Sequence, residues 1–171
     1  DWGHLQSLAW WLVWQYDLVA FEEIEPLLYQ GVVHGLTQPK IFKASWQSWY
    51  CDVVKDHYSE QLKTEQKPDA TVINKVITDI TNGEIVLNAP LKAKLFALFG
   101  KLAVLNNDHK TAVRAFEKAL SFDEAVGVKK MLKDCNTMLA TQLSEDESET
   151  LPVDAEIDEE KQTEAGESHG A

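Results

Sequence analysis

The chain has 171 residues, of which 44% are hydrophobic and 26% charged, and its formal net charge is −12. This length is enough for one modest core, and no apolar run reaches the roughly 18 to 20 residues that a membrane-spanning helix needs. The two cysteines, Cys51 and Cys135, are isolated and lack CxxC spacing, a pattern typical of reduced thiols in a soluble intracellular protein.

The negative charge is concentrated at the C-terminal end. Residues 144–171 contain eleven Asp and Glu against one Lys, whereas residues 1–143 contain seventeen acidic and fifteen basic residues. Because this tail is also poor in large apolar side chains, it cannot offset the entropy of ordering, and we expect it to be disordered. We divide the rest of the chain into an aromatic-rich helical region, 1–89, and a second region, 90–143.

The first predicted helix is rich in tryptophan, since all six tryptophans lie within the first 49 residues. Leu5, Leu8 and Leu12 share one face of this helix, and Trp10, Trp11 and Trp14 lie around it. Aromatic rings can stack on nucleic-acid bases, but three tryptophans in one short helix more often belong to a core or to a subunit interface. The pair Tyr16-Asp17 is expected to turn the chain.

A second helix is predicted over residues 18–33. Pro26 interrupts it, so either the helix kinks there or a new helix begins. Gly35 is a good C-terminal stop, because glycine tolerates the left-handed conformation that ends many helices. The following Leu36-Thr37-Gln38-Pro39 is then a tight connection.

Two further helices follow, each with a strong amphipathic pattern. Ser45 can cap the first, and Asp69 can cap the second after a polar loop over residues 63–69. The apolar stripes are Trp46, Trp49, Tyr50, Val53, Val54 and His57 in the first helix, and Val72, Ile73, Val76, Ile77 and Ile80 in the second. Steps of three and four residues favour a helix over a strand for the β-branched second stripe. Asn82-Gly83 ends it.

Residues 90–122 predict a helical hairpin. Pro90 suits the first position of a helix, and Asn106-Asn107-Asp108 supplies the turn between the two helices. The apolar residues at helical spacing are Leu91, Leu95, Leu98, Phe99, Leu102 and Leu105, then Ala112, Val113, Phe116, Ala119 and Leu120. Small residues such as Gly100 and Ala112 would let the helices approach closely around Phe116, as in a tetratricopeptide repeat.

A final helix is predicted from about Glu124 to Gln142, with Asp123 as its cap. Its apolar edge comprises Val128, Met131, Leu132, Cys135, Met138 and Leu139, which would close the domain or contact a neighbouring copy. Because no strand signal stands out, the sequence predicts an all-α fold of about seven helices, with a tetratricopeptide-like hairpin near its C-terminal end.

Signatures of catalysis are missing from the sequence. It contains no GxxxxGK[ST] phosphate loop, no GxSxG elbow and no catalytic Cys–His pattern, so we assign no catalytic residue, no metal site and no cofactor. Asp52, Asp56 and His57 lie within about one helical turn, and with Asp17 or Glu22 they offer one alternative, a divalent metal site for phosphodiester cleavage. Solvated carboxylates beside a histidine at the core's border explain the same pattern without a metal.

Basic side chains give the better indication of function. Lysine ammonium groups bind nucleic-acid phosphates through charge and counterion release, without reading sequence. The candidate DNA-binding residues are Lys40, Lys43, Lys92, Lys94, Arg114, Lys129, Lys130 and Lys133. For any single lysine, an ordinary solvated helix surface explains its presence equally well.

Three segments stand out by their order and spacing: Tyr16-Asp17, His34-Gly35-Leu36-Thr37-x-Pro39 and Ala119-Leu120-x-x-Asp123-x-x-x-Gly127-Val128-Lys129-Lys130. In this order and spacing they resemble the small subunit of tailed-phage terminases, of the type described as the terminase endonuclease subunit in temperate contractile-tailed phages. The resemblance covers about residues 5–143.

The resemblance implies a subunit without catalytic activity of its own in the cytoplasm of the bacterial host. It would bind double-stranded phage DNA, assemble into a homo-oligomeric ring and deliver the DNA to the terminase large subunit, which carries the ATPase and the nuclease. The acidic tail departs from the basic tail of some relatives, and we expect it to dock the large subunit or to prevent unproductive DNA binding. The alternatives are a metal-dependent endonuclease and a helical-repeat adaptor that binds only protein.

Overall fold

The computed structural model describes residues 5–64 and 67–149, and it confirms the all-α fold expected from the sequence. Seven helices follow one another in these residues, and no strand interrupts them. The helices are α1 (Gln6–Leu18), α2 (Phe21–Val33), α3 (Trp46–Lys63), α4 (Thr71–Asn82), α5 (Ala89–Leu105), α6 (His109–Phe122) and α7 (Lys129–Glu149).

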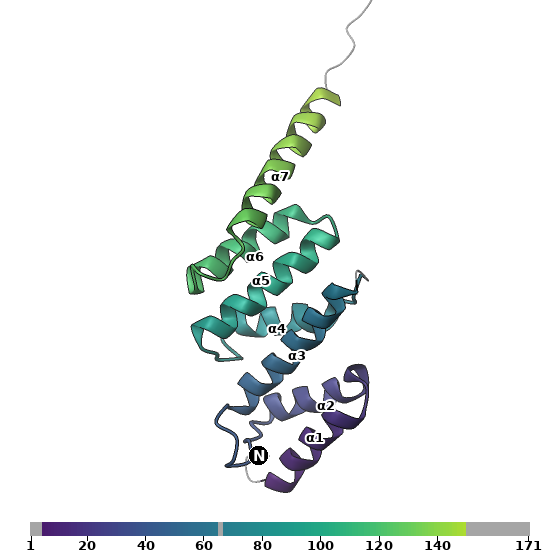
Figure 1. The fold of residues 1–171 in the computed structure, drawn as a ribbon, viewed down its shortest axis with the longest axis vertical. Coiled ribbons are helices and arrows are strands. Elements are labelled where there is room, and N and C mark those ends of the chain that lie inside the picture. The colour runs from purple at the N-terminus through teal and green to yellow at the C-terminus, as the bar shows by residue number, and fades with distance from the viewer. Residues whose placement is uncertain (1–4, 65–66, 150–171) are drawn as a thin grey trace, which may run out of the picture.

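The helices form an elongated stack (Figure 1). α1 packs on α2, α2 on α3, α3 on α5 and less extensively on α4, α4 on α5, α5 on α6, and α6 on α7. Apart from the contact of α3 with α5, each helix therefore packs on its neighbours in the chain. One cluster of buried side chains runs through the stack from Ala9 in α1 to Cys135 in α7. Contacts between neighbouring helical units are the organising feature of helical-repeat proteins.

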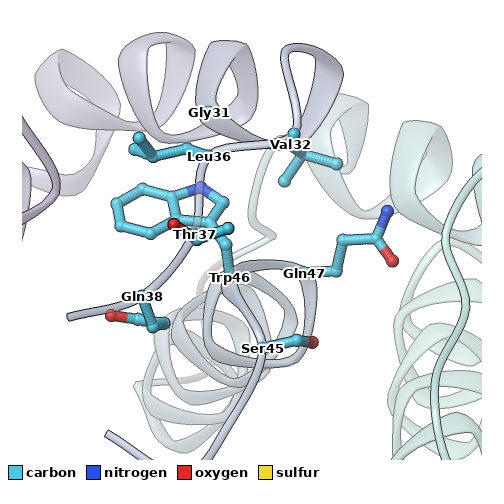
Figure 2. A pocket seen from close by; sticks show the side chains of 9 residues that line it. Gly31, Val32, Leu36, Thr37, Gln38, Ser45, Trp46 and Gln47 are labelled. Carbon is cyan, nitrogen blue, oxygen red and sulfur yellow. The ribbon is translucent and has the colours of Figure 1, made fainter. Parts of the chain in front are cut away.

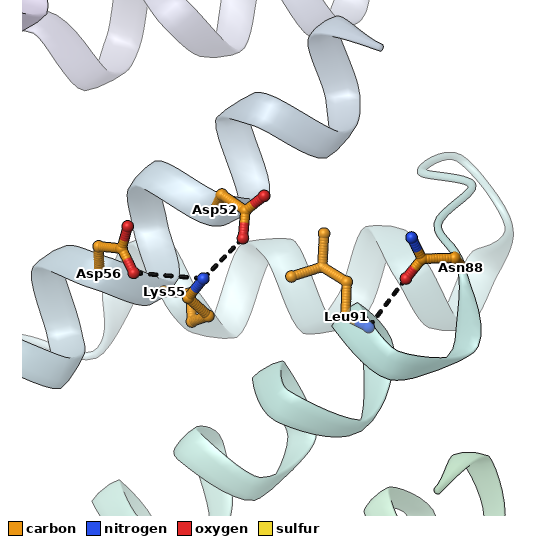
Figure 3. A network of polar contacts seen from close by, with 5 residues as sticks. All are labelled: Asp52, Lys55, Asp56, Asn88 and Leu91. Atoms are coloured by element: carbon orange, nitrogen blue, oxygen red, sulfur yellow. Dashed lines mark hydrogen bonds and ion pairs between the residues drawn. The ribbon is translucent and has the colours of Figure 1, made fainter. Parts of the chain in front are cut away.

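Short polar side chains cap the starts of α3 and α5. Ser45 Oγ accepts a hydrogen bond from the Ser48 backbone N–H at 3.1 Å, which confirms the cap predicted for α3. Asn88 Oδ1 accepts one from the Leu91 N–H at 2.9 Å at the start of α5 (Figure 3). α4 begins two residues after Asp69, whose carboxylate nevertheless accepts a hydrogen bond from the first backbone N–H of that helix at 2.9 Å.

Glycine ends two helices, as the sequence predicts. Gly35 and Gly83 follow α2 and α4 with φ angles of 66° and 80°, a conformation that glycine adopts without strain. Pro26 lies inside α2, so no new helix begins there. The first turn of the chain comes later than expected, because α1 includes Tyr16-Asp17 and ends at Leu18.

The last helix begins five residues later than predicted. Asp123 does not cap α7; its Oδ1 accepts a hydrogen bond from the Ala125 N–H at 2.9 Å, which closes a turn, and Gly127 then adopts a φ of 80°. α7 therefore starts at Lys129, and it continues to Glu149. Of the tail expected to be disordered, residues 150–171 lie outside the described residues.

Two tryptophans of α1 lie on the surface. Trp11 and Trp14 are 46% and 60% exposed, whereas α1 buries Ala9 and Leu12 against the rest of the stack. The expectation that these two tryptophans lie in the protein core is therefore wrong. The reason is positional: α1 is the end helix of the stack, so its outer side has no further helix among the described residues to pack against.

The hairpin of α5 and α6 packs through small residues, as predicted. Phe116 of α6 is fully buried, and Ala112 and Ala119 on the same face are also 0% exposed. Opposite them, a Cβ atom placed on Gly100 of α5 would lie 2.5 Å from Cε1 of the Phe116 ring. Glycine at position 100 thus allows α5 to approach the ring more closely than any other residue would.

The cap of α6 predicts a dependence of stability on pH. Hydrogen bonds from the Thr111 hydroxyl and backbone N–H lower the pKa of Asp108, whose Oδ1 lies 2.9 Å from that N–H. Because the folded pKa is below the unfolded one, this stabilisation is present at neutral pH and is lost as pH falls through the folded pKa. We expect Asp108→Ala to lower the free energy of unfolding by about 1 kcal/mol at neutral pH.

Urea unfolding at neutral pH and near pH 3 measures this contribution. Asp108→Asn keeps a hydrogen-bond acceptor but cannot titrate, so it should retain most of the cap and lose less stability on acidification than the natural chain. Equal acid sensitivity of the two proteins would contradict a role for the Asp108 carboxylate.

Candidate nucleic-acid interface

Nine basic side chains project from the last three helices. They are Lys92, Lys94, Lys101, Lys110, Arg114, Lys118, Lys129, Lys130 and Lys133, and all except the half-buried Lys92 are exposed. Among the side chains of residues 5–64 and 67–141, none of these cations forms a salt bridge with a carboxylate. These cations are therefore not held in ion pairs among these side chains, although Arg114 lies close enough to Asp108 to help lower the pKa of that carboxyl group, and their charge is available to an anionic partner.

One group of cations lies where α5 faces α3. Lys94 and Lys101 are seven residues apart on α5 and so project from the same side of it. Together with Lys55 and Ser59 of α3 they line a hollow of about 210 Å³, which we call the α3–α5 hollow. Val126, in the connection between α6 and α7, also lines it. Two ammonium groups on one side of α5 thus face a concave surface, an arrangement that favours phosphate groups.

Lys55 differs from the other two because it is paired. Its Nζ lies 2.6 Å from Asp52 Oδ1 and 3.2 Å from Asp56 Oδ1 (Figure 3). Partial burial alone would lower the pKa of Lys55, but the hydrogen bonds to both carboxylates raise it above its ordinary value. The free positive charge of the α3–α5 hollow therefore comes from Lys94 and Lys101.

The same pairing bears on the alternative metal site. Lys55 places a cation between Asp52 and Asp56, where a metal ion would have to bind. The His57 ring stacks on Phe21, with 3.8 Å between the ring centroids. Burial lowers the pKa of His57. Glu22 lies 3.7 Å from His57 Nε2. No group of three or more His, Cys, Asp or Glu residues in the described parts of the chain is arranged to hold a metal ion.

A second group of cations surrounds aromatic rings on another face of the hairpin. Arg114 and Lys118 line a hollow of about 290 Å³ bounded by α4, α5 and α6, which we call the α4–α6 hollow; Phe96 and Phe99 form part of its wall. Lys118 Nζ also lies 5.3 Å from the centroid of the Phe122 ring, and Lys92 Nζ lies 5.5 Å from it. Cations held beside aromatic faces can serve both phosphates and bases.

The remaining candidates are spread over the molecule. Lys129 and Lys133 line a shallow hollow along α7, and Lys130 is exposed beside them. Lys40 and Lys43 lie in the connection between α2 and α3, at the opposite end of the stack (Figure 1). The structure thus brings Lys94 together with Lys101, and Arg114 with Lys118 and Lys92, but it does not bring Lys40 and Lys43 to these groups.

A cavity that the sequence did not predict lies between α2 and α3 (Figure 2). It measures about 250 Å³ and is lined by residues of the Gly35-to-Gln38 turn and by Trp46, whose indole rises from α3 towards Gly31 and Leu36. Trp46 Nε1 donates a hydrogen bond to the Leu28 carbonyl at 3.0 Å. In the sequence, the glycine at position 31 is the one residue that could have indicated this close approach of α2 and α3, because a Cβ atom there would overlap the Trp46 ring.

Comparison with known proteins identifies no relative of this chain. No family model, curated protein or solved structure matches the chain. In the described residues, no helix has the length and apolar character required to cross a membrane.

Proposed function

We propose that this chain is the small subunit of a tailed-phage terminase. It would bind double-stranded phage DNA, form a homo-oligomer and deliver the DNA to the large subunit that carries the ATPase and the nuclease. The observation that carries the proposal is the hairpin of α5 and α6 with its unpaired cations, followed by the segment from Ala119 to Lys130 in which the resemblance to terminase small subunits is densest.

The chemistry of this function is non-covalent. Lys94 and Lys101 in the α3–α5 hollow, and Arg114 and Lys118 at the α4–α6 hollow, can neutralise phosphates on two faces of one hairpin. Such contacts supply affinity that depends strongly on salt and little on base sequence. A rigid helical pair would fix the spacing of these charges, so the same phosphates could be engaged in every copy of an oligomer.

A protein-binding adaptor is the second candidate, because one feature of the structure favours it. Stacked helical hairpins present concave surfaces that commonly bind other proteins, and the α3–α5 hollow lies between two successive units of the stack. A metal-dependent endonuclease has no comparable support, since Lys55 already neutralises Asp52 and Asp56.

Salt-dependent DNA binding distinguishes the first two candidates. We expect the full chain to bind a random-sequence duplex in a fluorescence anisotropy titration, with log K falling linearly with log salt at about −0.9 per neutralised phosphate. Lys94→Gln/Lys101→Gln should weaken binding and make this slope shallower by about 2, one for each phosphate contact removed. The complementary pair Arg114→Gln/Lys118→Gln tests the other hollow in the same way.

Lys63→Gln is the matched control, because Lys63 is an exposed helical lysine that already pairs with Glu60 at 2.7 Å. It should leave the slope unchanged. Absence of any salt-sensitive binding to duplex DNA would refute the terminase proposal and favour the adaptor. Nicking of supercoiled DNA in the presence of Mg²⁺, abolished by Asp52→Asn, would instead favour the endonuclease.

A further inference from the structure

Helix α1 is apolar on two opposite sides. One side buries Ala9 and Leu12 in the stack, as described above. The other side exposes Trp11, Trp14 and Leu18, which are 46%, 60% and 75% exposed and lie at steps of three and four residues. An apolar stripe on a helix is normally covered by another element. The exposed stripe of α1 therefore has the character of a contact surface.

The stripe continues onto the connection between α2 and α3. The ring of Trp10 lies 6.1 Å from that of Trp14 and 5.6 Å from that of Phe42, between centroids. Phe42 is 36% exposed and its neighbour Ile41 is 73% exposed. The resulting patch, which we call the aromatic end face, comprises Trp10, Trp11, Trp14, Leu18 and Phe42.

The size of the aromatic end face is that of half a protein–protein interface. With about 150–250 Å² for each large aromatic side chain, its exposed fractions amount to roughly 500–600 Å² of apolar surface. Two such faces together approach the lower limit of about 1,200 Å² for a stable interface once flanking polar residues are included. A single patch on a monomer is rarely larger than this without a binding role.

Charges of opposite sign flank the two ends of α1. At its N-terminal end, the hydrogen bond of 3.1 Å from Gln6 Nε2 to Thr37 Oγ1 holds the α2–α3 connection, which carries the exposed Lys40 and Lys43, beside the helix (Figure 1). At its C-terminal end lie exposed carboxylates, Asp17 in the last turn of α1 and Glu23 in the first turn of α2. The flanks are thus basic at one end and acidic at the other.

We propose that the aromatic end face binds the same face of a second copy of this chain, with the two α1 helices antiparallel about a two-fold axis near Trp14. An antiparallel pair places the lysines of one copy beside the carboxylates of the other, whereas a parallel pair would oppose like charges. The only charge on α1 itself is Asp17, so no like-charged groups meet at the centre. The contact is isologous, so each copy buries the same residues.

This proposal does not depend on DNA packaging. A two-fold contact pairs two chains, and a larger ring would need a second, head-to-tail contact elsewhere on the molecule. Dimerisation and DNA binding can therefore succeed or fail separately in experiments on the same protein.

Sedimentation velocity of the full chain over about a hundredfold range of concentration tests the dimer. We expect a monomer–dimer equilibrium, and we expect Trp14→Glu to raise the dissociation constant about 30-fold or more, the scale of losing a central aromatic anchor. Val86→Glu is the matched control, since Val86 is 70% exposed on a different part of the stack. Unchanged circular dichroism shows that each variant folds. A natural chain that stays monomeric throughout, or a dimer that Trp14→Glu leaves intact, overturns the proposal.

Charge reversal tests the antiparallel arrangement. Lys40→Glu/Lys43→Glu makes both flanks acidic, and Asp17→Lys/Glu23→Lys makes both basic, so each double variant alone should dimerise more weakly than the natural chain. Mixing the two variants should restore dimers, because acidic flanks then face basic ones. Failure of the mixture to dimerise better than its components would rule out the antiparallel pair.

Discussion

Phe116→Ala is expected to lower the free energy of unfolding by about 3–5 kcal/mol, the range for removing a fully buried aromatic ring. Phe116 is 0% exposed and fills the seam between α5 and α6, the most extensive pairing among the described helices. Removing the ring leaves a cavity, because rigid helices on both sides can collapse into it only partly. Urea denaturation followed by circular dichroism measures the change.

Gly100, which faces the Phe116 ring, provides a second test of the packing between α5 and α6. Replacing a glycine within a helix by alanine normally stabilises the helix by about 1 kcal/mol. At Gly100 the new methyl group would lie 2.5 Å from the buried Phe116 ring, so we expect a net loss, with overpacking costing about 1–3 kcal/mol. Combined with Phe116→Ala, the same methyl group enters the vacated space, and the double variant should be more stable than the sum of the single effects predicts.

The double-mutant cycle also decides how close the two helices are. If Gly100→Ala stabilises the protein as it would an isolated helix, the seam is wider than the structure gives it, and glycine has no packing role at position 100. The single variant Gly100→Ala already distinguishes the two cases, because they differ in the sign of its change in the free energy of unfolding.

The helices could be predicted because their signals are local. Helical spacing of apolar residues, the Ser45 cap and the Gly35 and Gly83 stops each depend on a few neighbouring residues, and the structure has a helix start or end at each of these positions. The start of α7 was missed for an equally local reason. Asp123 can cap a helix or close a turn, and the choice depends on Gly127, which takes a left-handed conformation four residues later.

The grouping of the cations could not be predicted, because it depends on tertiary packing. The sequence places Lys55 and Lys94 about forty residues apart, and only the packing of α3 on α5 brings them to one hollow. The contact of Lys55 with Asp52 has the i, i+3 spacing of a helical pair, whereas Asp56 is adjacent to Lys55 in the chain and its contact has no such local signal. The position of α1 at the end of the stack, which exposes Trp11 and Trp14, likewise has no local signature.

Tyr50→Phe is expected to lower the free energy of unfolding by about 2–3 kcal/mol, because it leaves a buried carboxyl group without its donor. The Tyr50 hydroxyl donates to Glu25 Oε1 at 2.5 Å and links α3 to α2, and Glu25 is only 7% exposed. Beside it, the Tyr29 hydroxyl donates to Asp79 Oδ2 at 2.9 Å and links α2 to α4. These two hydrogen bonds connect α2 with α3 and with α4.

The tyrosines should also make stability sensitive to alkali. Burial, followed by the hydrogen bond to Glu25, raises the pKa of Tyr50 far above its ordinary value, and burial with the bond to Asp79 raises the pKa of Tyr29 to about 12. A folded pKa above the unfolded one gives stability that is fully present below about pH 10 and is lost as pH rises. Tyr50→Phe should therefore show a smaller loss of stability above pH 10 than the natural chain.

An apolar replacement of both partners separates a missing hydrogen bond from a packing defect. Glu25→Leu/Tyr50→Phe leaves no unpaired polar group, so it should be more stable than Tyr50→Phe alone despite carrying one more substitution. Tyr29→Phe is the parallel comparison, because the carboxylate that it leaves without this donor, Asp79, is also only 7% exposed. If the double variant is no more stable than Tyr50→Phe, the loss comes from the shape of the core at position 50, and the buried hydrogen bond is not what fastens α2 to α3.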